Sequence, residues 1–199
     1  LPVSTTANPL GYLKYTYTAS EIQPDMLNAD ITKTTDSPSW GGLYLQYFEK
    51  FDQVQQQKGI LSVTKKLFIE KIGSDGKQEL LPLGKEKLKT GDKVITRLTL
   101  SLKQDMDFLY LKDFRAACFE PIGQLSGNQW KFGTVYYEES KDAVTNFFFN
   151  SLAKGTYVLE YPVWVNQAGT YQDGIATFQS MYAPEYTAYS EAGKITVTK

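Results

Sequence analysis

The covalent chemistry open to this chain depends first on its single cysteine. Cys118 stands in the sequence Cys118-Phe119-Glu120-Pro121. An internal thioester needs a cysteine sulfur and a glutamine acyl donor three residues later, and Pro121 has no side-chain carbonyl to supply. The sequence also offers no positioned base that would create a reactive thiolate. We therefore expect Cys118 to be a small buried apolar residue.

Paired carboxylates are the second candidate for chemistry. Asp105 and Asp107 would share one face of a strand and could bind Ca²⁺ or exchange protons, but between strands such residues more often cap a turn. Glu138 and Glu139 are adjacent and would point to opposite faces. The chain has no histidine, which removes Ser-His-Asp, Cys-His and histidine-ligated zinc chemistry together. We predict no catalytic residue, no metal site and no cofactor.

Charge and length narrow the class of protein. Lys and Arg number 21 against 22 Asp and Glu, so the net charge predicts neither a nucleic-acid partner nor contact of this fragment with an anionic membrane. A chain of 199 residues can bury a sizeable core. Residues 1–4 lack the features of a signal peptide, and we expect the chain to be a piece of a longer protein.

The hydrophobic pattern predicts strands along the whole chain. The segment 73–76, Gly-Ser-Asp-Gly, is typical of a hairpin turn between two strands. Strands at this spacing favour an all-β sandwich. The expected strands are Tyr12–Ala19, Leu27–Thr34, Gly42–Phe48, Ser62–Ile72, Lys93–Leu102, Phe108–Phe114, Val135–Glu138, Thr145–Asn150, Gly155–Val165, Gly174–Tyr182 and Lys194–Thr198.

A polar segment divides this pattern into two modules. The polar residues 53–59 are rich in glutamine. They have little reason to pack and are interpreted as a linker. The strands before it are marginal for an independent sheet. We therefore predict an incomplete β module over residues 1–57 and a self-sufficient sandwich over residues 58–199.

Several motifs in order resemble the last part of bacterial, Bacteroidetes-type α2-macroglobulins. They are WGGLYLQYFE at 40–49, LSVTKKLFIEK at 61–71, GDKVITRLTL at 91–100, residues 105–126, the segments 145–149 and 152–161, and FQSMYAPEY at 178–186. The resemblance covers nearly the whole chain. It implies the returning half of a CUB-like β module, followed by a C-terminal immunoglobulin-like or macroglobulin-like sandwich.

The resemblance also implies a function. In that family a cleaved bait region triggers a rearrangement, a thioester captures the attacking protease, and the last domain packs against the thioester-type domain. By position in the motif, Tyr182 is the candidate that shields the thioester, with Met181, Pro184 and Glu185 beside it. The implied partners are the upstream domains of the parent chain and, through the full-length protein, target proteases. The implied location is the periplasm or cell envelope, with the parent chain anchored as a lipoprotein.

A second function from another class stays open at this point. The chain could be a stand-alone carbohydrate- or adhesin-type β-sandwich that uses Trp40, Trp130 or Trp164 as a stacking platform. Exposed tryptophans lining one groove would favour this alternative, whereas a protruding Tyr182 loop would favour the interdomain role.

Overall fold

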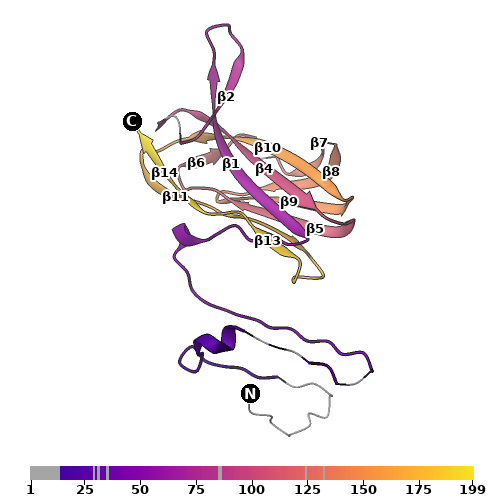
Figure 1. Ribbon diagram of the computed structural model, residues 1–199. Coiled ribbons are helices and arrows are strands. Elements are labelled where there is room, and N and C mark those ends of the chain that lie inside the picture. The colour runs from indigo at the N-terminus through magenta and orange to yellow at the C-terminus, as the bar shows by residue number, and fades with distance from the viewer. Residues whose placement is uncertain are drawn as a thin grey trace. The chain divides into compact units, whose positions relative to one another are not determined.

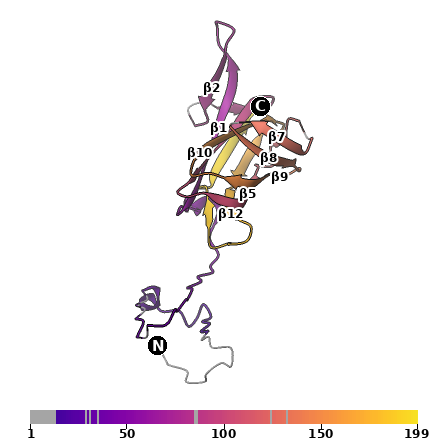
Figure 2. The same ribbon diagram turned by 90° about the vertical axis from the view of Figure 1, so that its right-hand side faces the viewer.

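The computed structural model describes residues 14–28, 30, 32–34, 36–84, 87–123, 125–131 and 133–199. The chain divides into two units, Leu1–Gln46 and Tyr47–Lys199. All strands of the described residues belong to the second unit, which is built from β1 to β14 (Figures 1 and 2).

The first unit differs from the expectation. Its described residues form one short 3-10 helix, η1 (Pro24–Leu27), and no strand. The described parts of the expected strands Tyr12–Ala19, Leu27–Thr34 and Gly42–Phe48 form no strand, while residues 12, 13, 29 and 31 lie outside the described residues. A strand needs neighbouring strands to satisfy its backbone groups, and short segments without a packed hydrophobic face do not make an independent sheet.

Three sheets make up the second unit. The five-stranded sheet has the order β2 (Gln78–Pro82), β1 (Leu61–Ile72), β4 (Lys93–Leu102), β10 (Gly155–Val165) and β6 (Phe119–Pro121). The six-stranded sheet has the order β13 (Thr187–Tyr189), β12 (Ala176–Ser180), β5 (Met106–Phe114), β9 (Val144–Leu152), β8 (Thr134–Ser140) and β7 (Gly127–Lys131). The third sheet contains β11 (Gly169–Asp173), β14 (Gly193–Thr198) and β3 (Leu88–Lys89), with β14 and β3 parallel.

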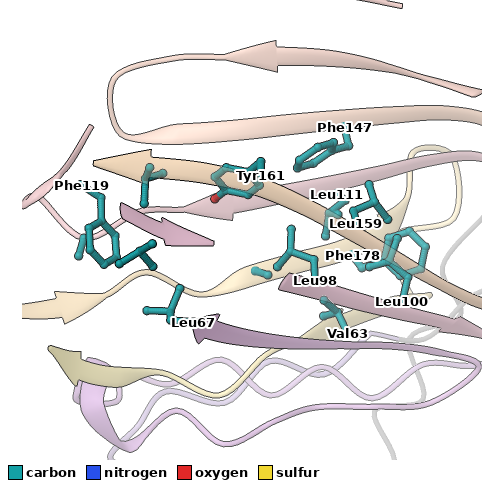
Figure 3. Packing of buried hydrophobic residues seen from close by; sticks show 14 of the residues in the cluster. Val63, Leu67, Leu98, Leu100, Leu111, Phe119, Phe147, Leu159, Tyr161 and Phe178 are labelled. Carbon is teal, nitrogen blue, oxygen red and sulfur yellow. The ribbon is translucent and has the colours of Figure 1, made fainter. Parts of the chain in front are cut away.

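The core lies between the two large sheets, as the strand pattern predicts. In β1 the buried positions Leu61, Val63, Leu67 and Ile69 alternate with outward ones. Figure 3 shows side chains of both sheets meeting in one layer. The five-stranded sheet also contributes Leu98, Leu100 and Leu159, and the facing six-stranded sheet contributes Leu109, Leu111, Phe147, Phe149 and Phe178. Burial of these large side chains holds the sheets together, and the predicted β-sandwich is confirmed.

The predicted hairpin is also present. The chain turns between β1 and β2 at residues 73–76, where Gly76 takes a positive φ of 77° that favours glycine. The amide of Lys77 donates to the Asp75 carboxylate at 3.0 Å, which fixes the turn. This hairpin extends beyond the rest of the sandwich (Figures 1 and 2).

The polar segment before β1 packs, contrary to its interpretation as a linker without contacts. The backbone amide and carbonyl of Gln57 pair with those of Tyr189 at 3.1 Å each, next to β13. The amide of Ala192 donates to the carbonyl of Val54 at 3.2 Å, and the Gln56 side chain donates to the carbonyl of Val63 at 2.8 Å. Glutamine-rich composition hid the pairings of Gln57 and of Val54 because their bonds use backbone atoms at a sheet edge.

Trypsin tests this pairing. We expect cleavage after Lys50 to precede cleavage after Lys58, because the paired Gln57 backbone must detach before a protease can bind it. Lys50 and Lys58 are both exposed, so side-chain access does not separate them. Mass spectrometry of the early fragments measures the order, and first cleavage after Lys58 would contradict the observed pairing.

The close approach of Gly174 to the backbone of Phe114 predicts the effect of a substitution at Gly174. A Cβ atom at this position would lie 2.2 Å from the carbonyl oxygen of Phe114, whereas one at Gly193 meets nothing within 4 Å. Gly174→Ala should therefore destabilise the fold by more than about 2 kcal/mol, and Gly193→Ala should change stability by at most about 0.5 kcal/mol. Urea denaturation measures both, and equal effects would contradict the packing.

Candidate functional site

The turn between β12 and β13 carries the residues that the sequence singled out. Tyr182 is 79% exposed, and Met181, Pro184 and Glu185 are exposed beside it. The turn therefore presents an aromatic ring and a thioether to the exterior. Tyr182 is not part of the sandwich core, so its side chain is available for contact.

Local hydrogen bonds hold this turn in shape. The amide of Ser180 donates to the carbonyl of Tyr186 at 3.1 Å, and the amide of Tyr186 donates to the carbonyl of Ala183 at 2.9 Å. The hydroxyl of Thr187 donates to the carbonyl of Pro184 at 2.6 Å. Since Tyr186 also packs against the core, the exposed ring of Tyr182 stands on a fixed base.

Phe108 on β5 supports the turn, and the sequence analysis missed it. Its backbone has a positive φ of 52°, an uncommon conformation for an aromatic residue. Its carbonyl accepts the amide of Met181 at 2.9 Å. Its ring meets the ring of Tyr182 edge to face, with centroids 5.3 Å apart and planes at 84°. No pattern in the sequence signals this backbone conformation.

The turn continues into an aromatic face on the outer side of the six-stranded sheet. Tyr110 stacks on Phe148 with centroids 5.2 Å apart, and Tyr137 lies 6.2 Å from Phe148. These rings stand on the adjacent strands β5, β9 and β8. We use the name aromatic face for this outward surface, which consists of Phe108, Tyr110, Trp130, Val135, Tyr137 and Phe148. Apolar groups gathered on one exposed face are typical of an interaction surface.

Trp130 and Trp164 do not form one stacking platform on the sandwich. Trp130 is 81% exposed and shares the outer face of the six-stranded sheet with Val135. Trp164 alternates with the buried Val163 and Val165 and so faces outward from the other large sheet. Trp40 belongs to the first unit. The arrangement in the second unit therefore does not support a groove of coplanar tryptophans.

The other candidate residues occupy structural positions. Cys118 is fully buried, and burial raises the pKa of its thiol to about 11, so the thiolate is scarce at neutral pH. Asp105 accepts the amide of Lys154 at 2.7 Å, which is a turn-capping contact. Burial raises the pKa of Glu138, whereas hydrogen bonds from Asn146 and Lys141 lower that of Glu139.

In the part of the chain that the structure describes, no group of three His, Cys, Asp or Glu side chains is arranged to hold a metal ion. Of the helices among the described residues, none is long and apolar enough to cross a membrane.

A buried ionic cluster lies between the sheets, and the sequence analysis missed it too. The ammonium of Lys65 on β1 is 3.0 Å from Asp113 on β5 and 2.9 Å from Asp173 on β11. It also donates to the carbonyls of Phe114 at 2.7 Å and Gly174 at 2.8 Å. The Lys65 side chain is only 2% exposed. Lys65 stands at an inward position in the alternating pattern of β1, and this is the sequence signal that could have revealed the cluster.

The fold defines the class of this protein as a macroglobulin-like β-sandwich. Solved structures with this fold include Salmonella alpha-2-macroglobulin reacted with methylamine, at 20% identity and TM-score 0.56 over 73% of this chain and 10% of that one. A tyrosine-to-glycine mutant of the Salmonella protein matches to the same extent. Escherichia coli alpha-2-macroglobulin from domain MG7 to the C-terminus matches at 17% identity and TM-score 0.53, over 72% and 24%.

A family model narrows the class to one family. The model of the bacterial alpha-2-macroglobulin MG10 domain matches residues 61–185, well over half of the chain. The chain belongs to this family. It spans only 10% of the Salmonella structures it resembles. No curated protein matches the chain.

The buried thiol gives a direct prediction. Native protein at neutral pH should not react with a maleimide over hours, because Cys118 is inaccessible and its pKa lies near 11. The same reagent should label the unfolded chain rapidly in guanidinium chloride. Intact mass measures the label, and Cys118→Ala is the control for other sites of reaction. Rapid labelling of the native protein would contradict the buried position.

Proposed function

We propose that this chain is a non-catalytic part of a bacterial α2-macroglobulin-type protease inhibitor, and that it packs against a thioester-type domain of the same parent chain. The observation that carries the proposal is Tyr182, which is exposed and yet held by a fixed turn. An exposed side chain that already has one conformation loses little entropy when a partner covers it.

The chemistry of the surface supports a protein partner. Tyr182 and Met181 offer a large ring and an adaptable thioether, and Phe108 orients the ring from below. A tyrosine placed over a thioester would exclude water from the electrophilic carbon, and its hydroxyl could donate to a neighbouring acceptor. Pro184 restricts the backbone of the same turn. Tyr182 is thus the shielding residue of the proposal, with Met181, Pro184 and Glu185 as contact residues.

The motif order and the fold also support a proposal about the kind of parent protein and its location. It is a broad-spectrum protease trap of the Bacteroidetes type, and this chain is its C-terminal region. Residues 1–57 are the returning half of a CUB-like module, which obtains its missing strands from elsewhere in the parent, and residues 58–199 are the last macroglobulin-like domain. The parent acts in the periplasm or cell envelope as an anchored lipoprotein. Its partners are its own upstream domains and the proteases it captures, with no nucleic acid and no cofactor.

Amine uptake by the full parent chain tests the role of Tyr182. If Tyr182 shields the thioester, Tyr182→Gly should raise the rate of methylamine incorporation at least about tenfold, which corresponds to ~1.4 kcal/mol. The melting temperature of the domain should change little, because the removed ring is exposed. Trp164→Ala, on the outer face of the opposite large sheet, should leave the rate unchanged.

Three results would refute this role. One is an unchanged rate of amine uptake in the Tyr182→Gly parent. Another is a large loss of stability in the domain, which would make Tyr182 a structural residue. The third is equal acceleration by Trp164→Ala, which would show a general loosening in place of a specific contact.

A further inference from the structure

The ionic cluster places an amine and two carboxyl groups in contact inside the fold. Lys65 Nζ lies 2.9 Å from an oxygen of Asp173 and 3.0 Å from an oxygen of Asp113. The Asp113 side chain is fully buried, and that of Asp173 is 16% exposed. The contact of Tyr182 with a partner does not involve any of these groups. An amine beside a buried carboxyl group is the reactant pair of amide formation, held at contact distance.

We propose that the folded domain joins Lys65 and Asp173 by an intramolecular amide bond, with Asp113 as the group that accepts the proton of the amine. The reaction needs no oxidant and no other reactant. The geometry assigns the roles, because Asp173 ends β11 at the start of the connection to β12, whereas Asp113 is held inside the core.

The atoms and charges of this step balance. The Lys65 ammonium passes one proton to the Asp113 carboxylate and becomes an amine. The nitrogen lone pair attacks Cγ of protonated Asp173, a C–N bond forms, and a C–O bond breaks. The hydroxyl leaves with the second proton of the amine as water. The products are one amide, one water molecule and protonated Asp113, and the total charge of the three side chains is zero before and after.

Burial favours the protonation state that this step needs. One ammonium and two carboxylates would leave an uncompensated negative charge in the core, which a proton on Asp173 removes. Burial raises the pKa of Asp173, and Asp113 adds to that shift, although Lys65 opposes it. Burial acts to lower the pKa of Lys65, but the two carboxylates outweigh it and the net shift is upward. Lys65 therefore rests as an ammonium ion, so a proton acceptor is required.

The surroundings hold the three groups in place. The hydroxyl of Tyr161 donates to Asp113, which leaves the other carboxylate oxygen directed to Lys65. The carbonyls of Phe114 and Gly174 fix the position of Nζ. After the reaction the amide N–H and protonated Asp113 remain as hydrogen-bond donors in the cluster. The side chains need little reorganisation to react, which is the main advantage of a preorganised site.

Such a bond would tie the first strand of the sandwich to a late segment of the chain. Residues 65 and 173 lie on β1 and β11, in different sheets. Unfolding from the N-terminal side could then not detach β1 completely. Resistance of this kind would suit a domain that works among proteases, but the proposal does not depend on that function.

Intact mass of the purified full chain is the deciding measurement. We expect the main species to be lighter than the sequence by one water molecule, and a digest to contain a branched peptide that joins Lys65 to Asp173. Lys65→Arg and Asp173→Ala should restore the sequence mass. Asp113→Ala should do the same while both bonded residues remain. Lys66→Arg, the exposed neighbour on β1, should keep the water loss.

The wild-type measurement decides the matter even if a variant fails to fold. A native protein with the full sequence mass would overturn the proposal and leave the cluster as an ion pair. A branch at Asp113 would overturn the assigned roles. Water loss that maps to Asp75-Gly76 and is reversed by mild alkali would show a succinimide in that turn, and it would also overturn the proposal.

Discussion

The ammonium of Lys65 constrains how the three sheets of the sandwich meet. A buried cation costs several kcal/mol unless partners surround it, and here the partners come from separate elements. β1 supplies the ammonium, β5 supplies Asp113, and β11 supplies Asp173. The donors and acceptors must lie within about 3 Å of each other, so the ends of β5 and β11 approach closely. Residue 174 must be glycine there, because a Cβ atom would collide with the backbone of Phe114.

The same strands that close the core position the exterior surface. β5 and β12 pair so that Ser180 lies opposite Leu109, which sets Met181 beside Phe108. One residue further along, Tyr182 stands clear of the core and contacts the Phe108 ring. The inward side chains of these strands fill the sandwich core. The outward side chains do not contribute to that core, and several of them are aromatic. The exposed aromatic surface is therefore a consequence of strand register, and its rigidity comes from the packed layer beneath it.

The arrangement suits binding better than catalysis. Its exposed groups include rings and a thioether, while the Cys118 thiol and the Tyr161 phenol, whose pKa values are raised, are enclosed in the sandwich. Membership in the bacterial alpha-2-macroglobulin MG10 family agrees with a domain that acts within a larger chain. Tyr182 is at the tip of a turn, where contact with another domain requires no rearrangement of the sandwich.

The sequence by itself predicted the long strands of the sandwich, the hairpin at residues 73–76 and the buried place of Cys118, because alternation and turn residues are local signals. It did not predict the short strands β3, β6, β7, β11 and β13. It failed where pairing between distant segments decides the structure. The strands expected before residue 49 are absent among the described residues. The polar Gln57 pairs with Tyr189 through backbone atoms, which composition does not reveal. The positive φ of Phe108 and the meeting of Lys65, Asp113 and Asp173 were decided by the tertiary structure alone. Each depends on strand register and on the fit of two sheets, and neither is encoded by neighbouring residues.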